Sequence, residues 1–179
     1  LNPIIYGMGT YTWTRYNSWT FQLMQCLVTT NTTNGVGWYR ISDAAGDGAW
    51  STYYKWATNA QSVYNYGVSS QQTNYQAIGL TLKCWMFHIL TDAFGDMPRS
   101  QVYLSNSPRY DTQAEVYEWM FQEADELVKL YDDPEWVNCP TNLIITEKQD
   151  RIYKGDMDKW ELYCKAIRAR LWLRKLPNW

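Results

Sequence analysis

The placement of apolar side chains constrains the fold of this 179-residue chain more than any other feature of its sequence. In five stretches, apolar residues recur every three or four positions, which is the spacing of one face of an α-helix. No stretch of strand length alternates apolar and polar residues in the period-two pattern of a half-buried strand. Helices that each carry one apolar stripe must pack those stripes against one another. The pattern therefore predicts an all-α fold of packed helices.

Local signals predict where several of these helices begin and end. Thr112 and Glu115 have the spacing of a capping box, and Asp156 is a favourable N-cap. Gly67 is expected to stop its helix in a left-handed conformation, and Gly95 is expected to end the next one, with Pro98 preventing a restart. The predicted helices cover about 13–29, 49–66, 72–94, 112–131 and 156–176. The two longest connections, about 30–48 and 133–155, are long enough to carry function.

Charge and composition argue against several functional classes. The chain has 16 Lys and Arg against 18 Asp and Glu, a formal charge of -2, so it lacks the basic surface expected of a nucleic-acid-binding protein. His88 is the only histidine, which argues against a multi-histidine metal site. Cys84 and Cys164 lie on predicted apolar helix faces, and we expect both to be packing residues. The residues predict neither a metal nor a cofactor.

Tryptophan and tyrosine are unusually frequent. There are 11 Trp and 15 Tyr against only 4 Phe. This bias suits partly solvated surfaces, such as sugar-binding faces and protein interfaces, where the ring packs and its polar group reaches water. Sugars need a flat ring against their C–H face and polar groups for their hydroxyls. The first long connection and the start of the next helix supply both, so we predict a ligand site there, with the alternative that these rings fold back onto the helices. The predicted site residues are Trp38, Tyr39, Arg40, Asp43 and Trp50.

Three segments in fixed order resemble the SusD-like (SusD/RagB) family. They are Leu-Thr-Asp-Ala-Phe-Gly-Asp-Met-Pro at 90–98, Tyr-Asp-Thr-Gln-Ala-Glu-Val-Tyr at 110–117, and Ile-Tyr-Lys-Gly-Asp-Met-Asp-Lys-Trp at 152–160. The resemblance covers about residues 50–176 and implies tetratricopeptide-like helix pairs with long irregular loops. Family members are much longer, so residues 1–179 are expected to be a single helical region of a larger protein. Arg99 departs from the family pattern, which usually has an aromatic residue there.

The resemblance also implies a function. SusD-like proteins are non-catalytic cell-surface lipoproteins of the outer membrane, and their lipid anchor is expected to lie outside this chain. They capture a glycan, or as an alternative a peptide, and deliver it to a SusC-like TonB-dependent transporter barrel. Their ligand surface is built partly from loops of the N-terminal half, which favours the sugar interpretation of the first long connection. No cofactor is implied; calcium occurs in some relatives, but no ligand cluster in this sequence supports it.

Two other functional classes remain open from the sequence. An α-helical glycoside hydrolase could use Asp92 and Asp96 as its carboxylates. Beside Gly95 and Pro98, however, we expect these aspartates to organise the turn by accepting backbone hydrogen bonds. A structural subunit of a cell-surface assembly could use the aromatic surplus for protein contacts. Three arginines of the last predicted helix are expected to complement its dipole and form salt bridges: Arg168, Arg170 and Arg174.

Overall fold

The computed structural model describes residues 1–28, 30 and 35–175, except for the side chain of Asp43. Within these ranges the structure is built from helices and contains no β-strand. Its β-structure there is limited to an isolated antiparallel bridge between Met97 and Asp111, so the all-α prediction is confirmed. The elements are α1 (Asn2–Arg15), the π-helix η1 (Tyr16–Thr20), α2 (Phe21–Leu23), the 3-10 helices η2 (Val36–Trp38) and η3 (Asp43–Gly46), α3 (Asp47–Ser69), α4 (Thr73–Phe94), α5 (Gln113–Tyr131), α6 (Pro134–Val137) and α7 (Met157–Lys175).

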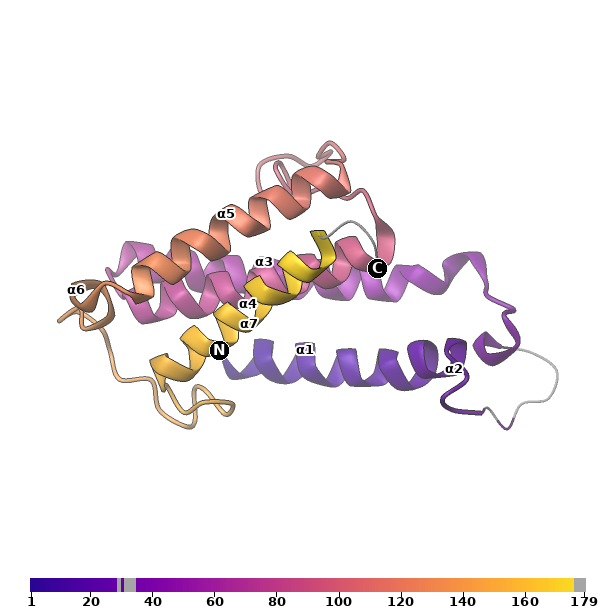
Figure 1. Ribbon diagram of the computed structural model, residues 1–179, viewed down its shortest axis with the longest axis horizontal. Helices are drawn as coiled ribbons and strands as arrows, with labels where there is room; N and C mark the ends of the chain where they lie inside the picture. The colour runs from indigo at the N-terminus through magenta and orange to yellow at the C-terminus, as the bar shows by residue number, and fades with distance from the viewer. Residues whose placement is uncertain (29, 31–34, 176–179) are drawn as a thin grey trace.

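A pair of long helices, α3 and α4, forms the centre of the molecule. Helix α1 packs along α3, while α5 and α7 pack against α4 and against each other. In Figure 1, α1 and α5 lie on opposite sides of the central pair, and α7 crosses between them. The α3–α4 hairpin is the helix pair that the tetratricopeptide-like prediction required.

Small residues let α3 and α4 approach closely. Ala57, Ala60 and Ala77 are fully buried. A Cβ atom added at Gly79 would lie 2.7 Å from the backbone nitrogen of Tyr64, a distance that real contacts do not reach. Close packing of this kind leaves no room for even one methyl group. The close approach of the two helices therefore depends on glycine and alanine at these positions.

The prediction that Gly67 ends a helix was wrong. Helix α3 continues through Gly67 to Ser69, and the left-handed residue of the turn is Gln71, with a φ of 55°. Gly67 is buried against the start of α4, where a Cβ atom added to it would lie 2.7 Å from the backbone nitrogen of Gln76. Its role is close packing, not chain reversal. Gly95 does end α4, with a φ of 75°, as predicted.

The first helix begins earlier than the sequence indicated. Helix α1 starts at Asn2, eleven positions before the predicted start near Trp13. Glycines at positions 7 and 9 lower the helix propensity of residues 2–12, so the sequence pattern did not predict a helix there. Gly7 is required by packing, since a Cβ there would lie 2.1 Å from the Trp56 ring. The buried face of α1 consists of Ile4, Ile5, Met8 and Thr12.

Both long connections contain short helices that the sequence did not predict. Helices η2 and η3 lie in the first connection, and α6 lies in the second. Pro134 begins α6 rather than only closing α5, because proline is well suited to the first helical position, where its missing N–H costs nothing. The capping box of α5 is present as predicted: the Thr112 hydroxyl accepts from the Glu115 N–H, and the Glu115 carboxylate accepts from the Thr112 N–H.

A buried carboxylate organises the turn that precedes α7. Asp150 is fully buried and accepts hydrogen bonds from the backbone N–H groups of Ile152, Tyr153 and Gly155 and from Nε1 of Trp160. Gly155 has a φ of 82°, and a Cβ there would lie 2.2 Å from the carbonyl oxygen of Ile145. The Gly155 position therefore tolerates only glycine.

The start of α7 follows the sequence prediction. The Asp156 carboxylate accepts from the N–H of Lys159 at 3.2 Å, which is the hydrogen bond of an N-cap. The buried face of the helix carries Cys164, as predicted for a packing residue, and Cys84 is likewise buried on α4. All four cysteines have free thiols.

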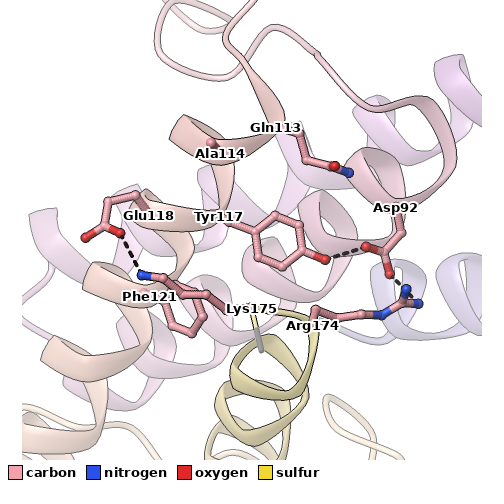
Figure 2. Close-up of a pocket in the computed structure, with 8 residues that line it drawn as sticks. All are labelled: Asp92, Gln113, Ala114, Tyr117, Glu118, Phe121, Arg174 and Lys175. Atoms are coloured by element: carbon pink, nitrogen blue, oxygen red, sulfur yellow. Dashed lines mark hydrogen bonds and ion pairs between the residues drawn. The ribbon is translucent and has the colours of Figure 1, made fainter. Parts of the chain in front are cut away.

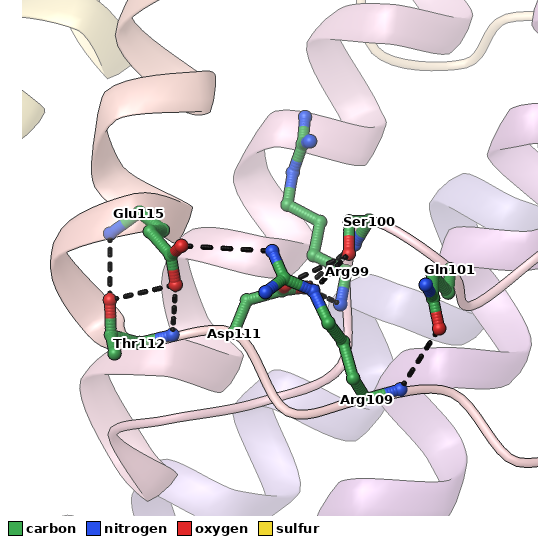
Figure 3. Close-up of polar contacts among 7 residues, drawn as sticks. All are labelled: Arg99, Ser100, Gln101, Arg109, Asp111, Thr112 and Glu115. Atoms are coloured by element: carbon green, nitrogen blue, oxygen red, sulfur yellow. Dashed lines mark hydrogen bonds and ion pairs between the residues drawn. The ribbon is translucent and has the colours of Figure 1, made fainter.

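A second buried carboxylate closes the connection between α4 and α5 (Figure 3). Oδ2 of Asp111 accepts from the N–H groups of Arg99 and Ser100 at 2.8 and 2.7 Å, and Oδ1 accepts from the Ser100 hydroxyl at 2.8 Å. The Arg109 guanidinium pairs with the same carboxylate at 3.0 Å. Asp111 also forms the bridge to Met97, so one residue joins both ends of the connection.

The Asp111 cluster predicts a specific dependence of stability on pH. Burial alone would raise the pKa of Asp111, but the N–H groups of Ser100 and Arg99 outweigh it and hold that pKa below its ordinary value of 3.8. A carboxyl group with a lowered folded-state pKa stabilises the fold above its unfolded pKa, and this contribution is lost as the pH falls through the folded pKa. We expect Asp111→Asn to cost about 2 kcal/mol at neutral pH, by removing a charged acceptor.

Urea denaturation of the wild type and Asp111→Asn at a series of pH values measures this contribution. The difference in unfolding free energy between the two proteins should shrink as the pH falls below the ordinary aspartate value of 3.8. A difference that stays constant down to acid pH would contradict the role assigned to the Asp111 charge.

Arg99 stands where the family pattern usually has an aromatic residue, and its contacts explain how an arginine fits at this position. Its side chain is largely buried, with the guanidinium 5.5 Å from the centre of the Phe87 ring and 5.1 Å from that of Trp119. The same guanidinium pairs with Glu123 at 2.6 Å, and Lys83 pairs with Glu123 at 3.0 Å. A planar cation packed on two rings can occupy the place of an aromatic side chain, provided that its charge is compensated. Glu123 supplies that compensation.

Candidate functional site

A hollow of about 520 Å³ lies between the end of α1, the start of α3 and the end of α4. We call it the aromatic hollow. Helix η1 lines one side of it, and η3 with the residues just before it lines another. The lining residues are Thr12, Arg15, Tyr16, Trp19, Thr20, Leu23, Ile41, Ser42, Ala45, Gly46, Ala49, Tyr53, Ile89, Ala93 and Phe94.

The π-helix η1 shapes one wall of the aromatic hollow. Within Tyr16–Thr20 the helix widens by one residue per turn, and the Phe21 N–H reaches the carbonyl oxygen of Tyr16. The side chains of Asn17 and Ser18 bond back to carbonyl groups of the preceding turn, which competes with regular α-helical hydrogen bonding. Short π segments are frequent at functional sites, because they redirect side chains out of the regular helical register. Here the segment contributes Tyr16, Trp19 and Thr20 to the lining.

Arg15 is fixed beside the aromatic rings. Its Nε donates to the hydroxyl of Tyr11 at 2.7 Å, and its guanidinium lies 5.3 Å from the centre of the Tyr11 ring and 5.5 Å from that of Trp19. Gly48 makes room for this arrangement, since a Cβ there would lie 2.8 Å from Nη2 of Arg15. The guanidinium is therefore held in place before any ligand arrives, which lowers the entropic cost of binding.

A second, outer hollow of about 460 Å³ adjoins the first. The two share five lining residues: Arg15, Trp19, Ile41, Ser42 and Ala45. The outer hollow adds Arg40, together with Gly35 and Val36 from the preceding loop. A ligand that extends out of the aromatic hollow past Trp19 would therefore meet Arg40.

The chemistry of the two hollows is aromatic and cationic. Their lining contains the rings of Tyr16, Trp19, Tyr53 and Phe94 and two arginines, and it includes no aspartate or glutamate among the described side chains. Rings can cover an apolar C–H face, and guanidinium groups can donate hydrogen bonds to hydroxyl, carbonyl or carboxylate oxygens. The site is suited to a ligand that has both an apolar face and exposed oxygen acceptors.

The structure brings the predicted site residues together only in part. Arg40 lines the outer hollow. Trp38 and Tyr39 precede it with exposed rings, 54% and 65% accessible, and the Tyr39 hydroxyl donates to the carbonyl of Leu23. Both rings lie next to Arg40 in the sequence without lining either hollow. The side chain of Asp43 lies outside the described residues.

Trp50 belongs to a different aromatic cluster. Its ring is 4.9 Å from that of Tyr54, 5.1 Å from that of Phe94 and 6.1 Å from that of Tyr110. Among these partners, Phe94 lines the aromatic hollow. Trp50 therefore supports the wall of the hollow by packing on Phe94, and the structure gives no direct place for it in the lining.

Sequence reasoning missed the residues that line most of the aromatic hollow. Tyr16 and Trp19 lie within the predicted helix over 13–29 at a spacing typical of a packed helix face, yet Tyr16 remains 40% exposed. One signal was available: the segment from Asn2 to Thr20 contains no acidic residue and only one basic residue, Arg15. A solvated helix face normally carries charges. The scarcity of charged residues beside several aromatic rings indicates a surface that contacts protein or ligand groups as well as water.

The aspartates at the end of α4 are engaged in the fold. Oδ1 of Asp96 accepts from the backbone N–H of Gln113, which confirms its predicted role in organising the turn. Asp92 instead accepts from the hydroxyl of Tyr117 and pairs with His88 and Arg174. The other two arginines of α7 also have partners, since Arg168 pairs with Asp125 and Arg170 with His88. No cluster of three or more His, Cys, Asp or Glu in the described residues could hold a metal ion.

A family comparison matches nearly the whole chain. The model of the SusD-like_2 family, described as starch-binding and associating with the outer membrane, matches residues 1–175. A comparison with curated proteins gives no match.

Several solved structures share the fold. A chitin-binding SusD homologue from Flavobacterium johnsoniae is 31% identical, with a TM-score of 0.58 over 70% of this chain and 26% of its own. A chitin-binding protein is 23% identical, with a TM-score of 0.71 over 87% of this chain and 33% of its own. A SusD homologue from Bacteroides fragilis is 27% identical, with a TM-score of 0.55 over 66% of this chain and 24% of its own. The chain thus spans about a quarter to a third of the length of these structures.

Proposed function

This chain belongs to the SusD-like family of outer-membrane-associated nutrient-binding proteins, and from that premise we propose that it captures an oligosaccharide in the aromatic hollow. The observation that carries the proposal is the joint placement of Trp19 and Arg15: a tryptophan ring with a fixed guanidinium beside it, in a hollow open to solvent. This pair offers a stacking surface and hydrogen-bond donors at one place, which is what a pyranose ring requires.

The ligand class follows from the relatives and from the lining together. The family model is described as starch-binding, and two similar structures are described as chitin-binding. We infer a neutral oligosaccharide of the starch or chitin type, because the hollow combines aromatic rings with donors to oxygen acceptors. A peptide ligand is the alternative. It would gain less from the lining, because the described side chains there include no carboxylate that could pair with a peptide amine or a basic side chain.

The role in uptake is also part of the proposal. As a SusD-like protein, the chain would act at the cell surface, held by a lipid anchor outside this chain, and would deliver its ligand to a SusC-like TonB-dependent transporter barrel. It would bind without chemical turnover and without a cofactor. None of the helices in the described residues combines the length and apolar character needed to cross a bilayer.

Trp19→Ala tests the proposed site. We expect this change to weaken oligosaccharide binding about tenfold or more, because aromatic residues at the centre of a binding site carry a large share of the affinity. Isothermal titration calorimetry with malto-oligosaccharides and chito-oligosaccharides measures the loss, and circular dichroism verifies that the variant remains folded.

The matched control is Trp13→Ala. Trp13 lies near the end of α1, is 65% exposed and does not line the hollow. Its replacement should leave affinity within about twofold of the wild type. Equal losses in both variants would contradict the assignment of the site, and failure of the wild type to bind either sugar would contradict the proposed ligand class.

A further inference from the structure

A third hollow, of about 600 Å³, lies where the end of α4, the start of α5 and the end of α7 meet (Figure 2). We call it the carboxylate hollow. Two ion pairs border it: Asp92 with Arg174 at 3.0 Å, and Glu118 with Lys175 at 3.3 Å. Figure 2 shows the Tyr117 ring between these pairs. The lining is completed by Gln113, Ala114 and Phe121.

The carboxylate of Asp92 is held in a fixed position. Its Oδ1 accepts from the Tyr117 hydroxyl, and its Oδ2 lies 3.1 Å from Nε2 of His88 and 3.0 Å from Nη2 of Arg174. A carboxylate can accept about four hydrogen bonds, so the two donors Tyr117 and Arg174 leave capacity for a ligand hydroxyl. An acceptor already oriented by the protein loses little freedom when a ligand binds.

The charges of the lining balance. Two carboxylates, Asp92 and Glu118, face two cations, Arg174 and Lys175. Such a lining offers both acceptors and donors without a net attraction for an anion or a cation. Sugar hydroxyls both donate and accept, and the exposed part of the Tyr117 ring supplies a flat apolar surface. The chemistry therefore favours a neutral polyhydroxylated ligand over a charged one.

The aromatic hollow and the carboxylate hollow lie on different faces of the last turns of α4. Ile89 and Ala93 line the aromatic hollow, whereas Asp92 lines the carboxylate hollow. Residues 89 and 93 share one helix face, and residues 88 and 92 share the adjacent one. The helix thus separates the two hollows, and each must take its own sugar residues.

We propose that the carboxylate hollow is a second saccharide-binding site, separate from the aromatic hollow. The inference rests on the proposed function, since it assumes that the protein binds sugars. Asp92 and Glu118 would accept hydrogen bonds from ligand hydroxyls, Arg174 and Lys175 would donate to ligand oxygens, and the Tyr117 ring would cover a C–H face. Two sites on one protein would raise its avidity for a polysaccharide that reaches both.

Site-resolved NMR tests the inference on the full 179-residue chain. The probes are maltotriose and triacetylchitotriose, titrated into nitrogen-15-labelled protein. We expect shifts in the backbone amides of Ala114 and Tyr117 and in the side-chain amide of Gln113, in addition to shifts of the Trp19 indole. Ala114→Trp should fill the carboxylate hollow from an exposed position and weaken binding there about tenfold or more, while Ala114→Ser keeps it open.

Two variants that each remove one negative charge test the site without filling the carboxylate hollow. Glu118→Gln should weaken binding at the carboxylate hollow, whereas Glu126→Gln, an exposed position on the same helix outside the lining, should not. Shifts confined to the Trp19 indole would overturn the second site and leave the proposed function intact. Shifts confined to residues 113–117 would support the second site and overturn the aromatic hollow as the capture site. No shift at either place with either sugar would overturn both.

Discussion

Replacing Asp150 with alanine is expected to lower the free energy of unfolding by about 4 kcal/mol. The carboxylate is fully buried and accepts from four donors: the backbone N–H groups of Ile152, Tyr153 and Gly155 and the indole N–H of Trp160. Its removal would leave these donors without their acceptor and would create a small void. Because the turn positions the start of α7, we expect the packing of α7 on α4 and α5 to loosen as well.

Urea denaturation followed by circular dichroism measures the effect, with Asp158→Ala as the control. Asp158 lies in the first turn of the same helix and is exposed, so its loss should cost only about 0.5 kcal/mol through the helix dipole. If the two variants lost similar amounts of stability, Asp150 would not be the organising residue of this turn. Asp150→Asn should fall between them, because the amide retains one acceptor oxygen.

Replacing Gly79 with alanine is expected to lower the free energy of unfolding by about 3 kcal/mol. The added methyl group would lie 2.7 Å from the backbone nitrogen of Tyr64 and 3.0 Å from the carbonyl oxygen of Ala60. Both neighbours belong to the backbone of α3 and cannot rotate away, so the α3–α4 pair would have to separate. This cost exceeds the roughly 1 kcal/mol that alanine gains over glycine in a helix.

The same substitution at Gly9 should have the opposite sign. Gly9 lies on α1, and a Cβ there meets no atom within 4 Å. Gly9→Ala is therefore expected to raise the free energy of unfolding by about 0.5–1 kcal/mol, through helix propensity alone. Thermal and urea denaturation of both variants would reveal the contrast. A stabilising effect of alanine at position 79 would contradict the close helix approach seen in the structure.

Where the fold was predictable from sequence, the determining interactions are local. The Gly95 stop, the capping box at Thr112 and Glu115, and the N-cap at Asp156 each involve residues within a few positions of one another. Gly67 shows the limit of such reasoning. A glycine near a helix end has the same local appearance whether it reverses the chain or admits a neighbouring backbone, and the difference depends on Gln76.

The candidate site was harder to predict because it is assembled from distant segments. Residues 12–23, 41–53 and 89–94 meet only in the folded chain. Arg40 was predicted from the sequence to belong to a ligand site, and in the structure it lines the outer hollow. The sequence could not indicate that Trp19 would stand beside Arg15 in a widened helix, nor that Trp50 would pack against Phe94 behind the lining.

The most direct test of the account is a crystal structure of the chain soaked with a chito-oligosaccharide or a malto-oligosaccharide. The account predicts a pyranose ring stacked on Trp19, with oxygen atoms within hydrogen-bonding distance of Arg15 and with the chain of sugars continuing towards Arg40. A sugar bound on Trp38 and Tyr39 or on the outer face of α1, with the aromatic hollow left empty, would contradict the central claim.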